Sequence, residues 1–279
     1  MHRQMKSAQR GQGWLVSFAV LILLVAVATV LYTVSKSTSD KPTTPKELPV
    51  TKFSDKNLDE IAQTLAADYL VTGDSGRNED IQALTNTLNN LKSSSLDAAK
   101  KTLQQLRNDQ LSEALITLKS LALSTESKRA AAKLWVDIGN IENLRSDKAA
   151  IGAYQKSVTL DTDNINAWNR IGHLERRRKE YDKAEIAYKN VTRLSNSKSH
   201  TEAVSLANFG LLYQSQNKHE EAIKSFQLAL TINTELGNKS AIASNSENLA
   251  GLYRKQNNLE QAEQYYQKSL SIYQESKQN

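Results

Sequence analysis

Hydrophobic positions recur every three or four residues through most of the chain after residue 52. The first segments with this spacing are LDEIAQTLAADYLV, NEDIQALTNTLNNLK and SLDAAKKTLQQLRNDQLSEALITLKSLA. Residues three and four positions apart lie on one face of an α-helix, so each segment is expected to form an amphipathic helix or a pair of them. The pattern predicts about four helices between Phe53 and Thr125, with a turn at Gly73–Gly76.

One segment near the N-terminus differs, because its apolar run is continuous. Residues 14–34 read WLVSFAVLILLVAVATVLYTV, 21 residues without a charge. At about 1.5 Å of rise per residue, a helix of this length spans a hydrocarbon core of roughly 30 Å. Arg3, Lys6 and Arg10 precede the run, which places the N-terminus in the cytoplasm by the positive-inside rule. We predict a single transmembrane anchor; a signal peptide cleaved near Ala26–Ala28 is the alternative.

A polar spacer follows the anchor. Residues 35–52 contain all three prolines of the chain, Pro42, Pro45 and Pro49, and show no helical periodicity. Such a segment is typical of a semi-extended linker. The predicted order is a cytoplasmic N-terminus at 1–13, the anchor at 14–34, the linker at 35–52, and then a large domain outside the cytoplasmic membrane.

From about residue 131 onward a longer pattern repeats four times. Each copy has a small residue in a first helical segment, a small residue in the next segment, and a large aromatic residue four positions later. The first small residues are Gly139, Gly172, Gly210 and Ala250; the second are Ala150, Ala184, Ala222 and Ala262; the aromatic residues are Tyr154, Tyr188, Phe226 and Tyr266. Small residues let two helices approach closely, and a large side chain one turn further fills the remaining space. Each copy is therefore predicted to form a helical hairpin, and successive hairpins must stack to bury their apolar faces.

This pattern resembles the tetratricopeptide repeat, in which the residues W, L-G, Y, A, F/Y and A recur over about 34 positions. The match is fullest in the units that begin at Trp168 and Leu206. The second small residues are 34, 38 and 40 positions apart, and such lengthened repeats are similar to those of the kinesin light chain and its bacterial relatives. The resemblance implies that the second helix and the connecting loop are extended in these units.

The resemblance also implies an all-α fold, a right-handed α-solenoid of helical hairpins that follows the transmembrane helix and the linker. Four units are expected within residues 129–279, at about 131–163, 165–198, 203–236 and 243–276. Residues 53–128 are expected to form a helical region that caps the solenoid and includes a degenerate repeat. The proline that commonly follows the second helix is absent, so Asp161–Asn164 and Gly237–Asn238 are expected to end the helices instead.

In this family the first helices of successive repeats line a concave groove that holds peptides, so the exposed positions of these helices form the predicted site. They are Asn140, Asn169, Arg170, His173, Arg176, Arg177, Asn208, Gln214, Asn248, Arg254 and Lys255. Asparagine is frequent among them, and its side chain offers donors and an acceptor to any peptide backbone. Arg170, Arg176 and Arg177 permit two interpretations: a solvated helix end, or a groove that prefers acidic partners.

Composition and charge narrow the chemistry. The net charge is +6, but residues 1–50 hold six Lys and Arg against two Asp and Glu, so the repeat region is nearly neutral and no nucleic-acid partner is expected. The chain has no cysteine, and its four histidines form no metal-binding pair such as HExxH. No nucleophile elbow or glycine-rich phosphate loop occurs. We therefore expect no catalytic residues, no metal and no cofactor.

The sequence thus favours a membrane-anchored scaffold that binds protein or peptide partners and catalyses nothing. The leading hypothesis is an adaptor in the assembly of an envelope complex of the secretion, pilus, conjugation or export type, with its repeats on the periplasmic side of the inner membrane. A chaperone-like or quality-control binder of translocated unfolded proteins is the first alternative. A structural repeat protein that self-assembles into homo-oligomers is the second.

Overall fold

The computed structural model describes residues 52–53, 56–69 and 77–278. Within these residues every regular element is an α-helix, as the sequence predicts. None of the helices in these ranges is long and apolar enough to cross a bilayer. The predicted N-terminus at 1–13, the anchor at 14–34 and the linker at 35–52, apart from its last residue, lie outside the described residues.

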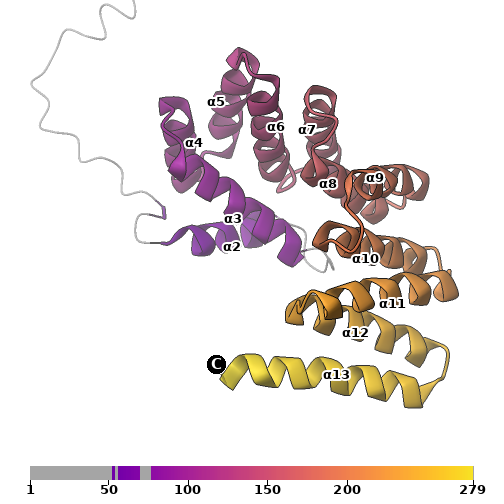
Figure 1. The fold of residues 1–279 in the computed structure, drawn as a ribbon. Coiled ribbons are helices and arrows are strands. Elements are labelled where there is room, and N and C mark those ends of the chain that lie inside the picture. The colour runs from indigo at the N-terminus through magenta and orange to yellow at the C-terminus, as the bar shows by residue number, and fades with distance from the viewer. Residues whose placement is uncertain (1–51, 54–55, 70–76, 279) are drawn as a thin grey trace, which may run out of the picture. The chain divides into compact units, whose positions relative to one another are not determined.

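Figure 1 shows the helices of the described chain in order from indigo to yellow. Their bounds are α2 (Leu58–Tyr69), α3 (Arg77–Ser93), α4 (Asp97–Arg107), α5 (Leu111–Ser124), α6 (Lys128–Glu142), α7 (Asp147–Leu160), α8 (Ile165–Arg177), α9 (Tyr181–Leu194), α10 (His200–Ser215), α11 (His219–Glu235), α12 (Lys239–Lys255) and α13 (Leu259–Gln278). The helices from α4 onward form the hairpins α4–α5, α6–α7, α8–α9, α10–α11 and α12–α13, and each hairpin packs against the next.

Each of three hairpins is held by a glycine packed against an aromatic ring, as predicted. A Cβ added to Gly172 would lie 2.4 Å from Cε1 of Tyr188, so the close approach of α8 to α9 requires glycine. Gly139 and Gly210 face the aromatic rings of their own hairpins in the same way. All three rings are fully buried, and burial of such large side chains is a major source of stability in the stack.

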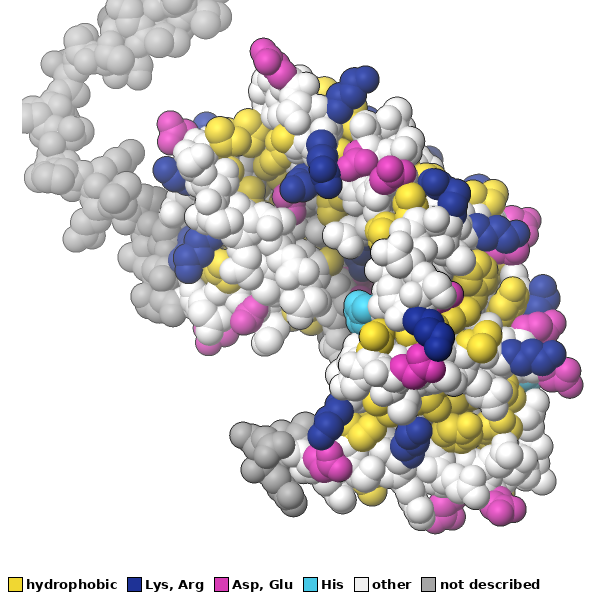
Figure 2. Space-filling model, viewed as in Figure 1, with side chains coloured by type: hydrophobic (Ala, Val, Ile, Leu, Met, Phe, Trp, Pro, Cys, Tyr) yellow, Lys and Arg dark blue, Asp and Glu magenta, His cyan; other side chains and the backbone are white. Residues whose placement is uncertain are grey.

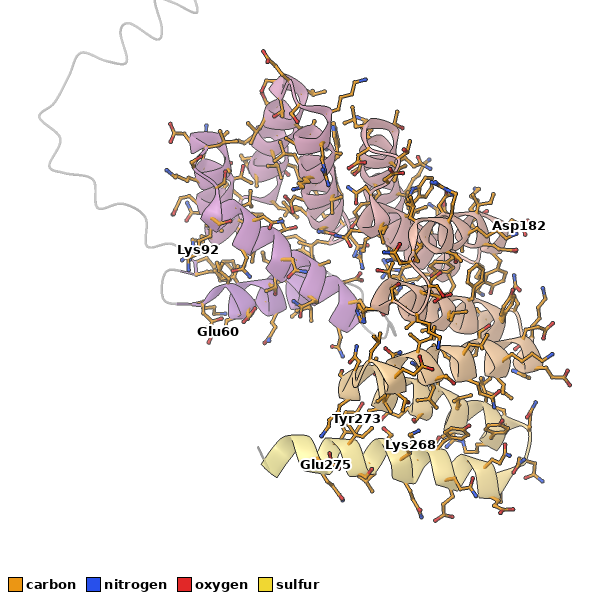
Figure 3. The ribbon with its side chains drawn as sticks, in the orientation of Figure 1. Glu60, Lys92, Asp182, Lys268, Tyr273 and Glu275 are labelled. Carbon is orange, nitrogen blue, oxygen red and sulfur yellow. The ribbon has the colours of Figure 1, made fainter. Side chains whose placement is uncertain are left out.

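The last hairpin differs, because its aromatic residue is partly exposed. Tyr266 of α13 is 39% exposed, whereas the equivalent Phe226 of α11 is 0% exposed. The exposed hydrophobic residues of α13, which we call the α13 face, are Leu259, Tyr266, Leu270 and Tyr273. Figure 3 labels Tyr273 on the side of α13 that faces α12, and Figure 2 shows hydrophobic patches among Lys and Arg along the last hairpins. No further hairpin of the described chain covers the α13 face.

Helix ends follow capping and turn chemistry. The side chains that accept a hydrogen bond from the backbone N–H three positions later are those of Asn57, Ser127, Ser146, Asn164, Ser199, Asn238 and Asn258. The predicted stops are confirmed, since α7 ends at Leu160 before Asp161, and Gly237 follows α11 with a φ of 66°.

The turn inside a hairpin uses a left-handed residue in all hairpins from α4 to α13 except one. These residues are Asp109, Lys179, Asn217 and Asn257, with φ between 59° and 64°. The α6–α7 turn has no such residue, and α6 ends three positions after Gly139, whereas α8 ends five positions after Gly172. In the sequence this unit also has one residue fewer between its two small residues, Gly139 and Ala150, than the other units have.

The lengthened repeats place their extra residues partly where the resemblance implied. The second helices α11 and α13 have 17 and 20 residues, against 14 in α9. The first helices also lengthen, however, from 13 residues in α8 to 17 in α12. The expected longer loop is absent between α11 and α12, because Gly237 turns the chain sharply and Asn238 caps α12 at once.

Helix α3 has a position that the sequence does not predict. It packs against α2 and α4, as a capping helix would, but it also packs against α6. Its side chains reach α8 as well. The helix therefore lies on the same first helices that carry the predicted binding residues.

Candidate functional site

The predicted site residues lie on α6, α8, α10 and α12, and we call their common surface the first-helix face. It consists of Asn140 on α6; Asn169, Arg170, His173, Arg176 and Arg177 on α8; Asn208 and Gln214 on α10; and Asn248, Arg254 and Lys255 on α12. The repeat fixes their placement, because equivalent positions of successive hairpins come side by side in the stack. The surroundings of these residues differ sharply between the two ends of the face.

On α6 the first-helix face is joined to α3 by a ladder of hydrogen bonds. Asn140 donates from Nδ2 to the backbone carbonyl of Ala83 at 3.3 Å and to Oγ1 of Thr87 at 3.0 Å. Thr87 donates to Oδ1 of Asp137 at 2.9 Å, and Asn90 donates to the same oxygen at 3.1 Å. Asn140 therefore already binds a peptide backbone, that of its own chain.

A buried carboxylate joins α3 to α8. Asp80, only 5% exposed, accepts hydrogen bonds from Nη2 of Arg170 at 2.6 Å and from Nη1 of Arg177 at 2.8 Å. Burial alone would raise the pKa of Asp80, but the two guanidinium groups outweigh it and hold the pKa below its ordinary value. Burial would likewise lower the pKa of Arg177, and the carboxylates beside it raise that pKa instead. All three groups are therefore charged at neutral pH.

The same arginines extend the network to α6 and α7. The Arg177 guanidinium also binds the carboxylate of Asp147 at the start of α7. Nε of Arg170 donates to the Tyr154 hydroxyl at 3.3 Å, and this hydroxyl donates to Oδ1 of Asn140 at 2.6 Å. One continuous polar network thus links α3, α6, α7 and α8 in an environment where charges are weakly screened.

His173 of α8 makes a further contact with α3. Its Nδ1 lies 3.0 Å from Oε2 of Glu79. Burial would raise the pKa of Glu79, but His173 lowers it below its ordinary value. The Glu79 side chain is 57% exposed, so this pair contributes less than the buried Asp80 contacts.

Asp137 of α6 is a buried carboxyl whose hydrogen bonds come from neutral groups. It is 5% exposed, and its hydrogen-bond donors are Thr87 and Asn90. Burial raises its pKa to about 6, and these two hydrogen bonds only partly oppose the rise. At neutral pH the contact between α3 and α6 thus holds a carboxylate that its surroundings disfavour.

The other predicted residues lie on the part of the face beyond α3. Asn208 of α10 donates to Oδ1 of Asn169 on α8 at 3.1 Å, which links two successive hairpins. Arg176 donates to Oγ of Ser215 at 3.4 Å. Gln214 and Asn248 are half-buried, whereas Arg254 and Lys255 are exposed. The structure thus brings Asn140, Arg170, His173 and Arg177 together under α3 and leaves the α10 and α12 residues on an open surface.

Sequence reasoning missed the α3 side of this site. Asp80, Thr87 and Asn90 were expected to belong to a cap, and their partners lie 47 to 97 positions further along the chain. Their spacing of seven and three residues places them on one face of a helix. That regular polar stripe is the only local signal of a second contact surface on α3.

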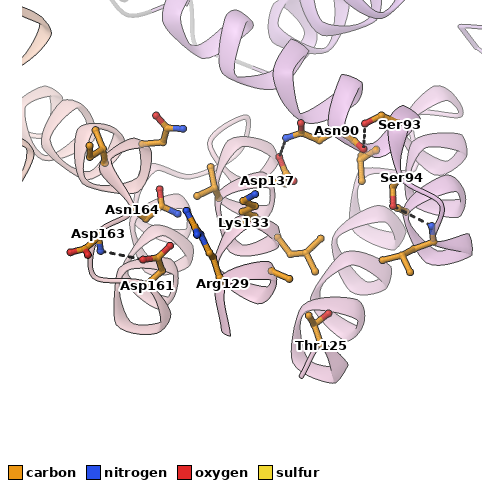
Figure 4. A pocket seen from close by; sticks show the side chains of 18 residues that line it. Asn90, Ser93, Ser94, Thr125, Arg129, Lys133, Asp137, Asp161, Asp163 and Asn164 are labelled. Carbon is orange, nitrogen blue, oxygen red and sulfur yellow. Dashed lines mark hydrogen bonds between the residues drawn. The ribbon is translucent and has the colours of Figure 1, made fainter. Parts of the chain in front are cut away.

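An open cavity of about 640 Å³ adjoins the end of α3 (Figure 4). The bonded pair Asn90 and Asp137 lies at one side of it, and Arg129 and Lys133 of α6 and Asp161 after α7 add charges of both signs. No group of His, Cys, Asp and Glu in the described residues is arranged to hold a metal ion. The cavity and the first-helix face offer hydrogen-bond donors, hydrogen-bond acceptors and charged side chains.

Stacked helical hairpins with a polar face on their first helices define a helical-repeat scaffold for protein–protein interaction. A tetratricopeptide-repeat family model matches residues 163–235 and 201–275, which contain the second, third and fourth predicted units. Residues 163–275 are thus tetratricopeptide repeats, as the repeat pattern predicts.

Solved structures share this fold at low sequence identity. BtubC (BKLC) from P. vanneervenii matches with a TM-score of 0.59 at 13% identity, over 80% of this chain and 93% of that chain. The MamA RS-1 ArsTM double mutant matches with a TM-score of 0.53 at 17% identity, over 70% of this chain and 99% of that chain. MamA 41-end from Desulfovibrio magneticus RS-1 matches with a TM-score of 0.51 at 16% identity, over 69% of this chain and 98% of that chain. No curated protein matches the chain.

Proposed function

We propose that this protein is a membrane-anchored scaffold whose repeats bind protein partners during assembly of an envelope complex. The observation that carries the proposal is the open part of the first-helix face, where Asn169, Asn208, Gln214 and Asn248 lie on successive hairpins. Amide side chains pair with both the N–H and the C=O groups of an extended backbone, so such a row suits a peptide segment. The uncharged run at residues 14–34 supports an anchor in the inner membrane, with the repeats in the periplasm.

Partner capture from native membranes tests this function. The full chain, cross-linked in membranes and purified, is expected to recover a few stoichiometric envelope proteins. A variant with Gln214→Ala, Asn248→Ala and Arg254→Ala should lose them while its helical circular dichroism is unchanged. A matched control carries Gln155→Ala, Asn190→Ala and Lys189→Ala on second helices. Equal recovery by both variants would place the site elsewhere, and many substoichiometric clients would favour the chaperone-like alternative.

The orientation has a separate test. Protease added to spheroplasts should digest the repeats, because the positive-inside rule places them outside the cytoplasm. Repeats that stay protected until the membrane is lysed would contradict the proposed periplasmic location.

Self-association is a second candidate function, and the α13 face favours it. Tyr266 is exposed where its counterparts in the preceding hairpins are buried, which leaves an apolar helix surface open to another molecule. Sedimentation over increasing concentration should then show a dimer that Tyr266→Glu abolishes. Leu228→Glu, at another exposed position on α11, is the control. A wild-type chain that stays monomeric would exclude this candidate.

A further inference from the structure

Helix α3 carries two stripes of opposite chemistry. Leu84, Leu88 and Leu91 are buried in the hydrophobic core that α3 shares with α2 and the neighbouring hairpins. The other stripe is polar and faces α6 and α8 with Asp80 and Thr87 among its residues. The core that holds these leucines also contains Ile138 and Ile141 of α6, so α3 meets α6 through apolar and polar side chains, whereas it reaches α8 through charges and hydrogen bonds. Polar contacts between parts of one chain are typical of surfaces that separate and rejoin.

The polar stripe lies where a ligand of the first-helix face would lie. Its carboxylate occupies the fork between Arg170 and Arg177, and its backbone carbonyl at Ala83 accepts from Asn140. A foreign helix can supply each of these groups, because none depends on the connection of α3 to the rest of the chain. The first turn of α3 is the acidic part, with Glu79 directly before Asp80. The covered surface is thus complementary to an acidic helix N-terminus.

The α3 contact leaves Asp137 buried without a cationic partner. Burial raises the pKa of Asp137, and its hydrogen bonds come from the neutral Thr87 and Asn90 of α3. A partner segment that supplies a cation or further donors to Asp137 would remove this part of the cost of covering the surface.

We propose that α3 is an internal stand-in for a partner, and that the surface beneath it on α6 and α8 binds the acidic first turn of a partner helix once α3 is displaced. This inference rests on the proposed function, because it names the class of partner for one part of the same face. Of the two interpretations of the arginines, the proposal follows the one in which they bind acidic partners, and it assigns this role to Arg170 and Arg177. Arg176 instead contacts Ser215 of α10.

Binding of the α3 sequence in trans tests the proposal. The probe is a fluorescent peptide of residues 77–93, RNEDIQALTNTLNNLKS, measured by anisotropy against the full chain in detergent. In the wild type, α3 occupies the site, which weakens the apparent affinity by the fraction of molecules that are open. Glu79→Gln with Asp80→Asn should loosen α3 and tighten peptide binding by about tenfold or more. A matched control, Asp59→Asn with Glu60→Gln, neutralises the exposed acidic pair in the first turn of α2 and should bind like the wild type.

Two further probes identify the site that binds the peptide. A peptide with the same neutralised pair should bind at least about tenfold more weakly to the loosened chain, and adding Arg170→Ser and Arg177→Ser to that chain should abolish binding of the acidic peptide. If the loosened, folded chain binds no more tightly than the wild type, or if binding ignores these arginines, the proposal is wrong.

Hydrogen exchange on the wild-type chain provides a measurement that needs no variant. Amides of α3 are expected to exchange through local opening, faster than those of α6 and α8. Exchange of α3 only together with α6 and α8 would show that α3 is a fixed part of the core. If partner capture succeeds and the α3 tests fail, the proposed function still stands on the open part of the first-helix face. If the α3 tests succeed and partner capture fails, α3 can be displaced but the proposed scaffold function is wrong.

Discussion

The buried carboxyl of Asp137 makes the stability of the α3 contact depend on pH. Its pKa is about 6 in the folded chain, against 3.8 in the unfolded chain. A raised pKa in the folded state favours folding when the carboxyl is protonated, so this contribution is fully present below pH 3.8 and is lost as pH rises through about 6. The difference corresponds to about 3 kcal/mol, at about 1.36 kcal/mol per pH unit. About 2 kcal/mol of this is lost between pH 4 and pH 7.

Asp137→Asn removes this titration and keeps the hydrogen bonds. The asparagine oxygen can accept from Thr87 and Asn90 as the carboxyl does, and the amide stays neutral at every pH. We therefore expect the variant to gain about 2 kcal/mol over the wild type between pH 4 and pH 7. Urea unfolding of both proteins at pH 4, 5, 6 and 7, followed by circular dichroism, measures the difference. Because Asp80 and Glu79 are present in both proteins, their effects cancel.

Asp163→Asn is the matched control, since Asp163 is exposed in the turn after α7. Its difference from the wild type should be small at each pH and should not grow toward pH 7. A difference for Asp137→Asn that stays constant from pH 4 to pH 7 would refute the assignment of a buried, disfavoured carboxylate. A difference that shrinks as pH rises would reverse the sign of the argument.

Three further substitutions test the packing of the repeats by unfolding measurements. Gly172→Ala should destabilise the fold by about 1–3 kcal/mol, since the added Cβ meets the buried Tyr188 ring. Gly152→Ala, in open space on α7, should stabilise the fold by about 0.5–1 kcal/mol. Equal effects of the two substitutions would contradict the close approach of α8 to α9. Lys179→Gly should stabilise by about 1 kcal/mol or less, because φ is 64° there, and a loss of stability would mean that the turn is not left-handed in solution. Phe226→Ala should cost about 3–5 kcal/mol and Tyr266→Ala about 1–2 kcal/mol, in line with their burial; similar costs would mean that something covers α13.

The repeat architecture could be predicted from the sequence because its determinants are local and periodic. Gly172 and Tyr188 lie 16 positions apart, and a glycine packs against an aromatic ring in the same way in the two hairpins beside theirs, so one physical argument applied to three hairpins. Asn164 and Gly237 likewise mark helix ends through their own side chain or backbone. The resemblance was less reliable for the longer repeats, where the added residues extend first helices as well as second helices.

Only one side of the candidate site could be predicted in this way. The positions of Asn140, Arg170 and Arg177 follow from the repeat, but their partners on α3 do not. Asp80 is one carboxylate in a polar helix outside the repeat, and no local rule selects a contact 97 positions away. The choice depends on how the N-terminal helices fold back onto the stack, which is a property of the whole core.

The contact between α3 and α8 also has a mechanical consequence. In a stack where each hairpin touches only its neighbours, a pull along the chain detaches hairpins singly from an end. Asp80 of α3 binds Arg170 and Arg177, which both lie on α8. This contact bridges the two hairpins between them, α4–α5 and α6–α7, and closes the chain from α3 to α8 into one loop. Under tension, α12 and α13, with their open outer side, should therefore unravel first and at low force, while the part closed by Asp80 yields as a single block. The solenoid thus has a compliant C-terminal end and a stiff N-terminal end.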